Sequence, residues 1–475
     1  MSTTGWTELN DFTPAALPIV LNKEIVGQAL EEGRAKQSWV LAFVVGTKPC
    51  FNKVFGAVDA CRRRGLPFFV IDAQQHFDAV LTHGLVEFAF TPHVGVNLQL
   101  RGDLVQKSAE LFYKTSRLAK WLRDNWPDVT VVPVVNGDTI LCPIIPAAWM
   151  FTRREKSIQN EAGLRSMSPN LFKNMPPDIA LDDFLDGQWD GDWHLLRTEP
   201  FPEQWDTFVS AAGCEHHMAP VELNRQHLIR EGYAPENIYL TGGVVVDALE
   251  LKRREKPEQS IFEIYPQLAR GKWLRLDVHR KENLSRQRFT AIFGALERIV
   301  RKGHQVNLLL MNATRHAVQH WGLGERLEAL KKAPNFLATE VWPAYDHVVE
   351  FYDSEHCLAA WTDSGGLQED MNMMGKPCLT IRFSTDRPET VMGNHGNLLV
   401  PPINDEFLAR VVSGVIEDPR VLGRFKKRPP LYGSKAGDKF ADAIAPHMHA
   451  NKPAFHWSQH WLGLAPFERN ADADF

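Results

Sequence analysis

Residues 362–389 read TDSGGLQEDMNMMGKPCLTIRFSTDRPE. The apolar run Cys357–Thr362, which precedes the polar turn Asp363–Gly366, predicts a buried strand, and Leu367–Met374 predicts a helix that a glycine ends. A second strand is expected at Cys378–Phe383. The turn would leave free backbone N–H groups at the positive end of the helix dipole, which suits an anion. Because a Ser-Gly-Gly sequence by itself is more often only a turn, the rest of the chain decides the interpretation.

This stretch contains five candidate binding positions. Ser364, Gly365 and Gly366 would present their N–H groups to the anion. Glu369 would repel a phosphate, so we expect it to accept hydrogen bonds from hydroxyl groups, such as those of a ribose. Arg387 could supply positive charge from a nearby strand end.

The composition is that of a globular protein. The chain has 475 residues, of which 44% are hydrophobic and 23% charged, which is enough for two or three domains with their own cores. The net charge of −5 argues against a nucleic-acid or acidic-membrane partner. We find no signal-peptide pattern in residues 1–22 and no apolar run near the roughly 20 residues of a membrane helix, so a cytoplasmic protein is expected. The six cysteines include no CxxC pair and predict buried, reduced thiols rather than disulfides or a metal site.

Apolar strand-like runs alternate with helical ones along the chain. Such continuous apolar strands predict parallel sheets covered by helices on both faces, with a ligand near the carboxyl ends of the strands. Two sets occur, so an α/β protein with two doubly wound domains is expected. The expected strands are Trp39–Val45, Pro67–Ile71, Val129–Val135, Trp273–Val278, Val306–Leu310 and Phe336–Val341, and the expected helices are Pro49–Arg64, Leu284–Lys302 and Glu325–Lys332.

These sets suggest a division of the chain. The predicted parts are an N-terminal extension at 1–38, a first domain at 39–240 with an insert at 167–201, a second domain at 241–406, helices at 407–450 that brace the first domain, and a tail at 451–475.

Several carboxylates and lysines follow the predicted strands of the first domain. Lys48 and Lys53 follow a glycine turn and suit a phosphate, although solvated lysines at a helix start are equally common. Asp138 ends a buried strand, where capping the next helix is the simpler role. Together with Glu161 and Glu203, which alone could be surface groups, it could supply acid and base to a closed cleft.

Cations follow the first strand of the second domain. His279 and Arg280 begin the sequence His-Arg-Lys-Glu-Asn, which suits a diphosphate because each contact would be charge-assisted, although a capped polar helix start has the same composition. His216 and His217 suggest a metal, but side chains of adjacent residues point in different directions, so no metal site is predicted.

These motifs occur in an order that resembles the UDP-N-acetylglucosamine 2-epimerase family, over roughly residues 39–450 without the insert. The motifs are Gly46–Pro49, Asn136–Thr139, Glu161–Ser166, Pro202-Glu203, His279–Asn283, Asp363–Glu369 and Arg387–Glu389. The resemblance implies two Rossmann-like domains facing across a cleft, of the glycosyltransferase-B type, with a UDP-sugar in the cleft and no redox cofactor. It implies that UDP leaves as a proton is lost from C2 of the sugar, giving a 2-acetamidoglycal. UDP then adds back as a proton reaches the other face of C2.

The resemblance also implies residue roles. Asp138, Glu161 and Glu203 match the catalytic carboxylates of the family, and His279 matches its catalytic histidine. The positions expected to bind the substrate are Lys48, Lys53, Arg165, Arg280, Ser364, Gly365, Gly366, Glu369 and Arg387.

The chain departs from the family pattern mainly at the sugar end. Lys48 stands where the family usually has Arg, and Gln204, Asp206 and Thr207 stand where it has Glu, Asn and Arg. Met311–Thr314 replaces a motif that in bacterial members helps to bind a second, activating UDP-sugar, so we expect no such activation. The insert could cover the sugar pocket and change which sugar fits, or it could be a peripheral decoration.

We expect the protein to be a non-hydrolysing UDP-N-acetylhexosamine 2-epimerase. We also expect it to form a homodimer. The alternatives are a hydrolysing 2-epimerase that releases UDP and free sugar, a catalytically silent UDP-sugar-binding protein, and a glycosyltransferase on the same fold.

Overall fold

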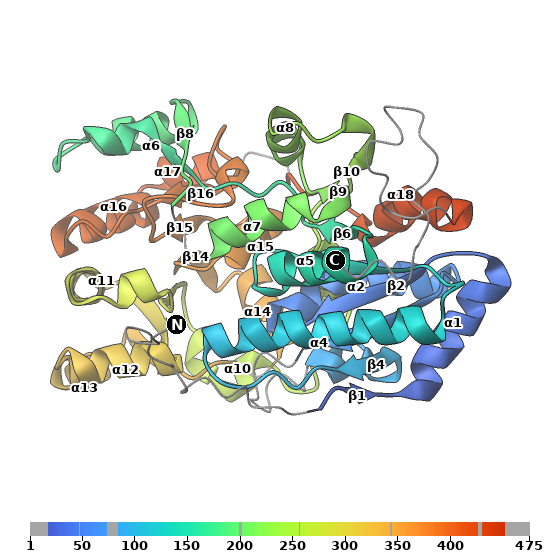
Figure 1. Cartoon of the computed structure of the whole chain (residues 1–475). Helices are drawn as coiled ribbons and strands as arrows, with labels where there is room; N and C mark the ends of the chain where they lie inside the picture. The colour runs from blue at the N-terminus through green and yellow to red at the C-terminus, as the bar shows by residue number, and fades with distance from the viewer. Residues whose placement is uncertain are drawn as a thin grey trace, which may run out of the picture.

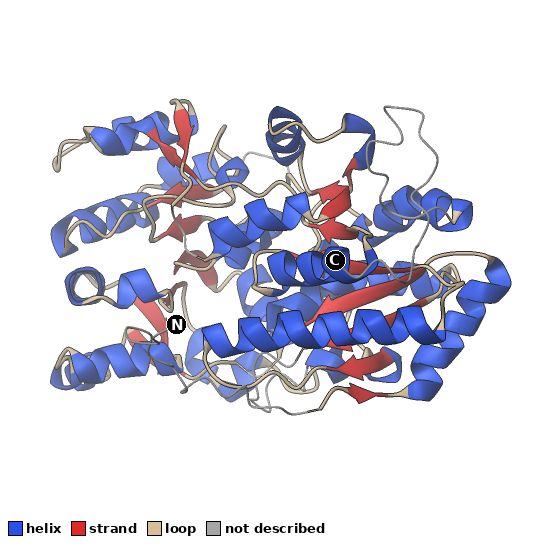
Figure 2. Cartoon of the chain, viewed as in Figure 1, coloured by secondary structure: helices blue, strands red, loops and turns tan. Residues whose placement is uncertain are grey.

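Two mainly parallel sheets with helices on their faces form the frame of the protein (Figures 1 and 2). The computed structural model describes residues 18–46, 48–73, 84–198, 202–255, 257–342, 344–425 and 430–451. We call the part built on the first sheet the first lobe and the part built on the second sheet the second lobe. The predicted α/β class with two Rossmann-like sheets is confirmed.

The first sheet has eight strands in the order β1-β4-β3-β2-β5-β6-β9-β10. All neighbours are parallel except β1 and β4. The strands are β1 (Val20–Leu21), β2 (Val40–Val45), β3 (Phe68–Asp72), β4 (Val94–Asn97), β5 (Val131–Asn136), β6 (Ser157–Asn160), β9 (Cys214–Ala219) and β10 (Ile238–Leu240).

The second sheet has six parallel strands in the order β13-β12-β11-β14-β15-β16. They are β11 (Trp273–Asp277), β12 (Gln305–Leu309), β13 (Phe336–Thr339), β14 (Cys357–Thr362), β15 (Cys378–Thr380) and β16 (Asn397–Leu399). A separate antiparallel pair, β7 (Met167–Pro169) and β8 (Trp193–Leu195), lies in the insert.

The α-helices fall into three groups along the chain. Those before the insert are α1 (Lys23–Lys36), α2 (Lys48–Arg63), α4 (Leu104–Asn125) and α5 (Leu141–Arg153). Those from the insert to the start of the second sheet are α6 (Leu181–Trp189), α7 (Glu203–Ala212), α8 (Glu222–Arg230), α9 (Val246–Arg254) and α10 (Ile261–Ile264). The remainder are α11 (Arg286–Arg301), α12 (Asn312–His320), α13 (Gly324–Leu330), α14 (Tyr345–Asp353), α15 (Gly365–Met374), α16 (Asp405–Glu417), α17 (Pro419–Phe425) and α18 (Ala436–Ala450).

Two parts of the predicted division need correction. The described end of the predicted N-terminal extension forms β1 and α1, and β1 pairs with β4 in the first sheet. A strand of two residues is too short for an alternating pattern to reveal it. Of the helices predicted to brace the first domain, only α18 packs on α2, whereas α16 packs on α11 of the second lobe. The remaining domain limits stay a prediction, and the tail after residue 451 lies outside the described residues.

A shared hydrophobic cluster joins the lobes. It includes Phe43 and Phe51 of the first lobe, Tyr345 and Phe351 of the second, and Phe440 of α18. The six cysteines all lie in described parts of the chain and are buried, free thiols, as predicted. Among the described helices, none has the length and apolar character that crossing a membrane requires.

Candidate functional site

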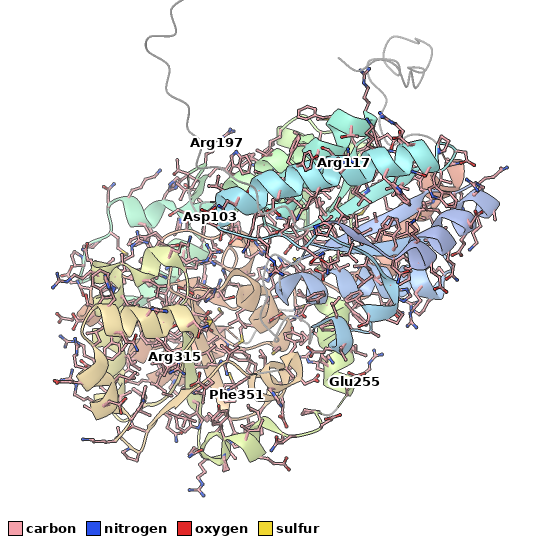
Figure 3. The ribbon with its side chains drawn as sticks, turned by 60° about the horizontal axis from the view of Figure 1, so that its bottom comes forward. Asp103, Arg117, Arg197, Glu255, Arg315 and Phe351 are labelled. Atoms are coloured by element: carbon pink, nitrogen blue, oxygen red, sulfur yellow. The ribbon has the colours of Figure 1, made fainter. Side chains whose placement is uncertain are left out.

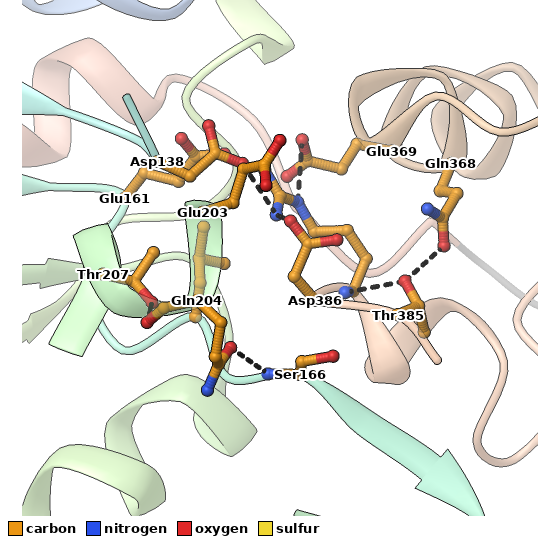
Figure 4. A network of polar contacts seen from close by, with 12 residues as sticks. Asp138, Glu161, Ser166, Glu203, Gln204, Thr207, Gln368, Glu369, Thr385 and Asp386 are labelled. Atoms are coloured by element: carbon orange, nitrogen blue, oxygen red, sulfur yellow. Dashed lines mark hydrogen bonds and ion pairs between the residues drawn. The ribbon is translucent and has the colours of Figure 1, made fainter. Parts of the chain in front are cut away.

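The candidate residues meet where strands of both sheets end. Asp138 and Glu161 follow β5 and β6 of the first sheet, and His279 and Ser364 follow β11 and β14 of the second. Because parallel strands bring their carboxyl ends to one edge, residues far apart in sequence converge there. Figure 4 shows Asp138, Glu161 and Glu203 facing Glu369 and Asp386.

Glu161 links the two lobes through ion pairs with two cations. Its Oε2 lies 2.6 Å from Nζ of Lys53, and its Oε1 lies 2.8 Å from Nη2 of Arg387. All three side chains are buried. Gly137 makes the close approach possible: its φ is +76°, and a Cβ there would lie 2.8 Å from Glu161 Oε2.

The carboxylates keep both cations charged despite their burial. Burial disfavours the Lys53 ammonium, but Glu161 and Asp138 outweigh it, so the pKa of Lys53 is raised. Burial also opposes the charge of Arg387, and Asp386, Glu369 and Glu161 raise the Arg387 pKa well above its ordinary value. The structure thus places Arg387 among carboxylates, so its predicted contact with UDP stays a prediction.

Glu369 is a fully buried carboxyl in α15. Its Oε2 lies 3.3 Å from Nε of Arg387, and neither of its oxygens makes a hydrogen bond. Burial raises the pKa of Glu369 to about 8, with Arg387 acting in the opposite direction. The predicted contact of Glu369 with ligand hydroxyl groups stays a prediction.

Glu203 opens α7 and lies near Arg280 of the second lobe. Its Oε1 is 3.5 Å from Nη1 of Arg280, which is also 3.6 Å from Oε1 of Glu282. Burial raises the pKa of Glu203, although Arg280 acts against the rise. Its Oε2 is buried without a hydrogen bond. A partly desolvated carboxyl of this kind is a candidate for proton transfer.

Asp206 lies one helical turn after Glu203, and its side chain is fully buried. Neither of its oxygens has a hydrogen-bond partner. Burial, followed by the charges of Asp138 and Glu203, raises the pKa of Asp206 to about 8. The sequence identified this position only as a departure from the family's Asn. A protonated Asp206 can donate a hydrogen bond, as that amide would.

His279 forms a charged pair with Asp363. Its Nδ1 lies 3.0 Å from Oδ1 of Asp363. Burial opposes the imidazolium charge, but Asp363 raises the pKa of His279 to about 10, and His279 helps to lower the pKa of Asp363 to about 2 against its burial. With Asp277 these residues have the spacing of a metal site. However, Asp363 already accepts the N–H groups of His279 and Arg280 and the side chain of Asn283.

The start of α15 has the features of an anion site. Ser364 caps this helix by accepting a hydrogen bond from the N–H of Leu367. A Cβ added at Gly366 would meet no atom within 4 Å, and one at Gly365 would lie 3.5 Å from Nη2 of Arg382. The space in front of the helix is therefore open, with a guanidinium group at its edge.

Arg382 is a site residue that the sequence analysis missed. Burial and then the charge of Arg280 lower the pKa of Arg382, and its Nη1 donates to Oδ1 of Asp386 at 2.9 Å. Its Nε and Nη2 donate to the carbonyl oxygen of Asp363. The sequence places Arg382 inside the strand Cys378–Phe383, whereas β15 ends at Thr380.

Arg165, a predicted binding residue, is not brought into this cluster. Arg165 donates to both carboxylate oxygens of Glu231, at 2.7 and 2.5 Å, and its guanidinium lies over the ring of Phe208. Its charge is thus paired at the end of α8, and its predicted contact with substrate stays a prediction. Lys48 begins α2, but its side chain lies outside the described part of the structure, as does Thr47.

The Asp206 carboxyl predicts a pH-dependent stability. Its pKa is about 8 in the folded protein against an ordinary 3.8, so folding favours the protonated form. The free energy of unfolding therefore falls as pH rises from about 4 to 8, by at most roughly 1.4 kcal/mol per pH unit from this group. We expect Asp206→Asn to unfold at a higher temperature than the wild type at pH 8, with the difference shrinking towards pH 4. A pH-independent difference in calorimetry would contradict this assignment.

Comparisons with known proteins agree with the geometry of the site. The family profile described as UDP-N-acetylglucosamine 2-epimerase matches residues 196–445 of the 475 residues. A UDP-N-acetylglucosamine 2-epimerase of Escherichia coli K12 is 28% identical over 403 residues, covering 82% of this chain and 94% of that protein. The enzyme of the same name from Methanocaldococcus jannaschii is 23% identical over 405 residues, covering 84% and 97%.

Solved structures show the same fold. The structure of the Methanocaldococcus jannaschii UDP-GlcNAc 2-epimerase in complex with UDP-GlcNAc and UDP covers 86% of this chain and 99% of its own, with 21% identity and a TM-score of 0.67. Since the family profile matches more than half of the chain, the chain belongs to the UDP-N-acetylglucosamine 2-epimerase family.

Proposed function

We propose that this protein is a UDP-N-acetylhexosamine 2-epimerase. The observation that carries the proposal is the arrangement of Asp138, Glu161 and Glu203 of the first lobe beside the cations and the helix start of the second. In the proposed reaction a carboxylate removes the proton from C2 of the sugar. The bond between C1 and the phosphate oxygen breaks, UDP leaves with the electron pair, and a double bond forms between C1 and C2. Addition of UDP to C1 and of a proton to the opposite face of C2 completes the inversion.

The start of α15 is suited to holding the leaving diphosphate. The backbone N–H of Ser364 donates to Oγ1 of Thr362, but those of Gly365 and Gly366 and the positive helix end favour an anion. Nη2 of Arg382 lies 3.5 Å from the Cβ position of Gly365, and the backbone N–H of Arg280 donates to Asp363 in the preceding turn. A diphosphate that receives these contacts is a better leaving group because the charge that develops on it is stabilised. We assign this role to Gly365 and Gly366 together with the two arginines, and to Ser364 the capping of the helix.

The carboxylates have different surroundings, which supports different roles. Both oxygens of Glu161 face cations and its side chain is fully buried, whereas the side chains of Asp138 and Glu203 are 19% and 29% exposed. We therefore assign proton transfer at C2 to Asp138 and Glu203, and assign to Glu161 the orientation of Lys53 and Arg387. Two proton-transfer groups fit an inversion because the proton leaves one face of C2 and returns to the other.

Glu203 provides the sharpest test of this function. The protein is incubated with UDP-GlcNAc and UDP-ManNAc in D2O, and the products are followed by NMR. We expect deuterium at C2 with UDP still attached to the sugar. Glu203→Gln should abolish this exchange and leave UDP affinity within about twofold, because a neutral amide cannot take the proton but keeps the shape of the side chain.

Glu282→Gln is the matched control, since Glu282 also pairs with Nη1 of Arg280 but is more exposed. It should retain exchange. Free sugar and UDP as products would instead establish the hydrolysing alternative, and UDP binding without turnover of either sugar would establish a binding protein for these ligands. Exchange in Glu203→Gln would overturn the assignment of Glu203.

Because the space above Gly366 is open, we expect a substitution there to change UDP affinity without lowering the stability of the fold. Gly366→Ala should leave the protein as stable as the wild type or more stable by up to about 1 kcal/mol, because Ala favours helix over Gly. UDP affinity, measured by calorimetry, should fall by at least roughly tenfold because the methyl group would occupy the anion's space. Gly27→Ala, at another helical glycine with no atom within 4 Å of an added Cβ, should leave UDP affinity unchanged. Unaltered UDP binding in Gly366→Ala would remove this glycine from the site.

We also propose that the protein is a homodimer that acts in the cytoplasm, where its free thiols stay reduced. Helix α4, which carries the labelled Arg117, lies on the surface (Figure 3). Tyr113 of α4 is 66% exposed and Phe151 of α5 is 72% exposed, and the rings of Phe112 and Phe151 are 5.9 Å apart. Exposed aromatic groups on adjacent helices favour burial against a second copy.

Light scattering tests the dimer. The wild-type mass should be twice that of one chain, and Phe151→Asp should shift it towards the monomer because a carboxylate cannot be buried in an apolar contact. Phe172→Asp is not suited as a control, since Phe172 packs in the second-lobe core. An exposed polar position, Lys120→Asp on α4, serves instead, and an equal shift by both changes would contradict the assignment of the aromatic surface.

A further inference from the structure

The insert connects the two lobes, although both of its ends lie in the first. It leaves after Ser166, close to Glu161, and returns at α7, which begins with Glu203. The backbone N–H of Ser166 donates to Oε1 of Gln204 at 2.7 Å, so the two ends are held together. Between them the insert extends over the second lobe, where α6 and β8 lie near α16, α17 and β16 (Figure 1).

The first part of the insert pairs with the segment that leads to Arg387. Met167 and Thr385 exchange two backbone hydrogen bonds of 2.9 Å, and Oγ of Ser168 donates to the carbonyl oxygen of Phe383 at 2.7 Å. The chain of the first lobe thus forms a short antiparallel contact with the second lobe.

The second part of the insert covers the edge of the second sheet. The side-chain amide of Gln188 donates to the carbonyl of Leu399 at 3.0 Å and accepts its N–H at 2.9 Å. Nε1 of Trp189 donates to the carbonyl of Asn397 at 3.0 Å. Phe184 and Leu185 are fully buried in the hydrophobic core of the second lobe. Side chains of α6 therefore form hydrogen bonds with backbone groups of the edge strand β16 that another strand would otherwise pair with.

Hydrogen bonds lead from these contacts to the site. Oγ1 of Thr385 donates to Oε1 of Gln368 at 2.7 Å and accepts the backbone N–H of Arg387 at 3.0 Å (Figure 4). Nδ2 of Asn397 also donates to Gln368 Oε1, at 2.8 Å. Gln368 precedes Glu369 in α15. Both contacts of the insert therefore end at residues next to the Arg387 and Glu369 pair.

We propose that residues 167–198 form an interlobe strap in which Ser168 and Gln188 act as positioning residues for Arg387. The strap begins shortly after Glu161, ends shortly before Glu203, and contacts the segment Thr385–Arg387 between its ends. It therefore sets the distance between the carboxylates of the first lobe and the cation of the second. Arg387 then meets Glu161 before any ligand binds. Such preorganisation reduces the rearrangement needed when substrate enters. The strap itself follows from the contacts of the chain, and its effect on turnover rests on the proposed function.

Hydrogen exchange of the unliganded protein tests the strap directly. In Ser168→Ala and Gln188→Ala we expect backbone amides of residues 383–392 to exchange roughly five- to tenfold faster. Ser168→Ala removes the hydrogen bond to Phe383 of this segment. Gln188→Ala removes the two hydrogen bonds to Leu399, close to Asn397, whose side chain leads through Gln368 to Thr385. Amides of β2 should be unaffected. Asp183→Asn, on the exposed side of α6, is the matched control and should match the wild type.

Unchanged exchange at 383–392 in Ser168→Ala would overturn the proposal, even if Gln188→Ala unfolds more widely. Steady-state kinetics give a second readout. Both variants should lower kcat with UDP-GlcNAc by roughly five- to tenfold while UDP affinity stays within about twofold, because the start of α15 is intact. If the wild type turns over no UDP-sugar, the proposed function fails, but faster exchange in both variants would still establish the strap.

Discussion

The Glu161 carboxylate, held by Lys53 of one lobe and Arg387 of the other, is the interaction on which the site depends. Each cation is buried, and each would be costly to bury without its acidic partner. The pair of contacts can form only if the ends of β6 and β15 face one another across the lobes. The fold, the Gly137 turn and the insert all serve this condition: the sheets supply the strand ends, the glycine allows close approach, and the insert ties the lobes together.

Charge is divided unevenly along the site. At the proposed nucleotide end, the guanidinium of Arg382 lies at the start of α15, and the backbone N–H of Arg280 donates to Asp363 just before that helix. At the sugar end, Glu203 and Asp206 are partly or wholly desolvated, and the pKa of each is raised. A diphosphate and a proton-transfer centre need opposite surroundings. Under the proposed function the site provides both, because the arginines belong to the second lobe and Glu203 and Asp206 to the first.

The strand ends explain how much of the site the sequence could predict. Buried apolar runs located β2, β5, β11 and β14, so the residues that follow them, such as Asp138 and Ser364, were found. Arg382 was missed because apolar residues continue past the last hydrogen-bonded position of β15. The Arg165–Glu231 pair joins residues far apart in sequence, and a local pattern cannot reveal it. The docking of the insert was equally hidden, since Gln188 and Trp189 bind backbone groups of β16 that any sequence would offer.

A double-mutant cycle on Glu161 and Arg387 measures the central contact most directly. The free energies of unfolding of wild type, Glu161→Gln, Arg387→Gln and the double variant are compared in the unliganded protein. Removing one partner leaves the other charge buried with one ion pair fewer, so the second substitution should cost less after the first, with a coupling energy on the order of 2 kcal/mol. Two effects that add to within about 0.5 kcal/mol would contradict a site held together across the lobes by this carboxylate.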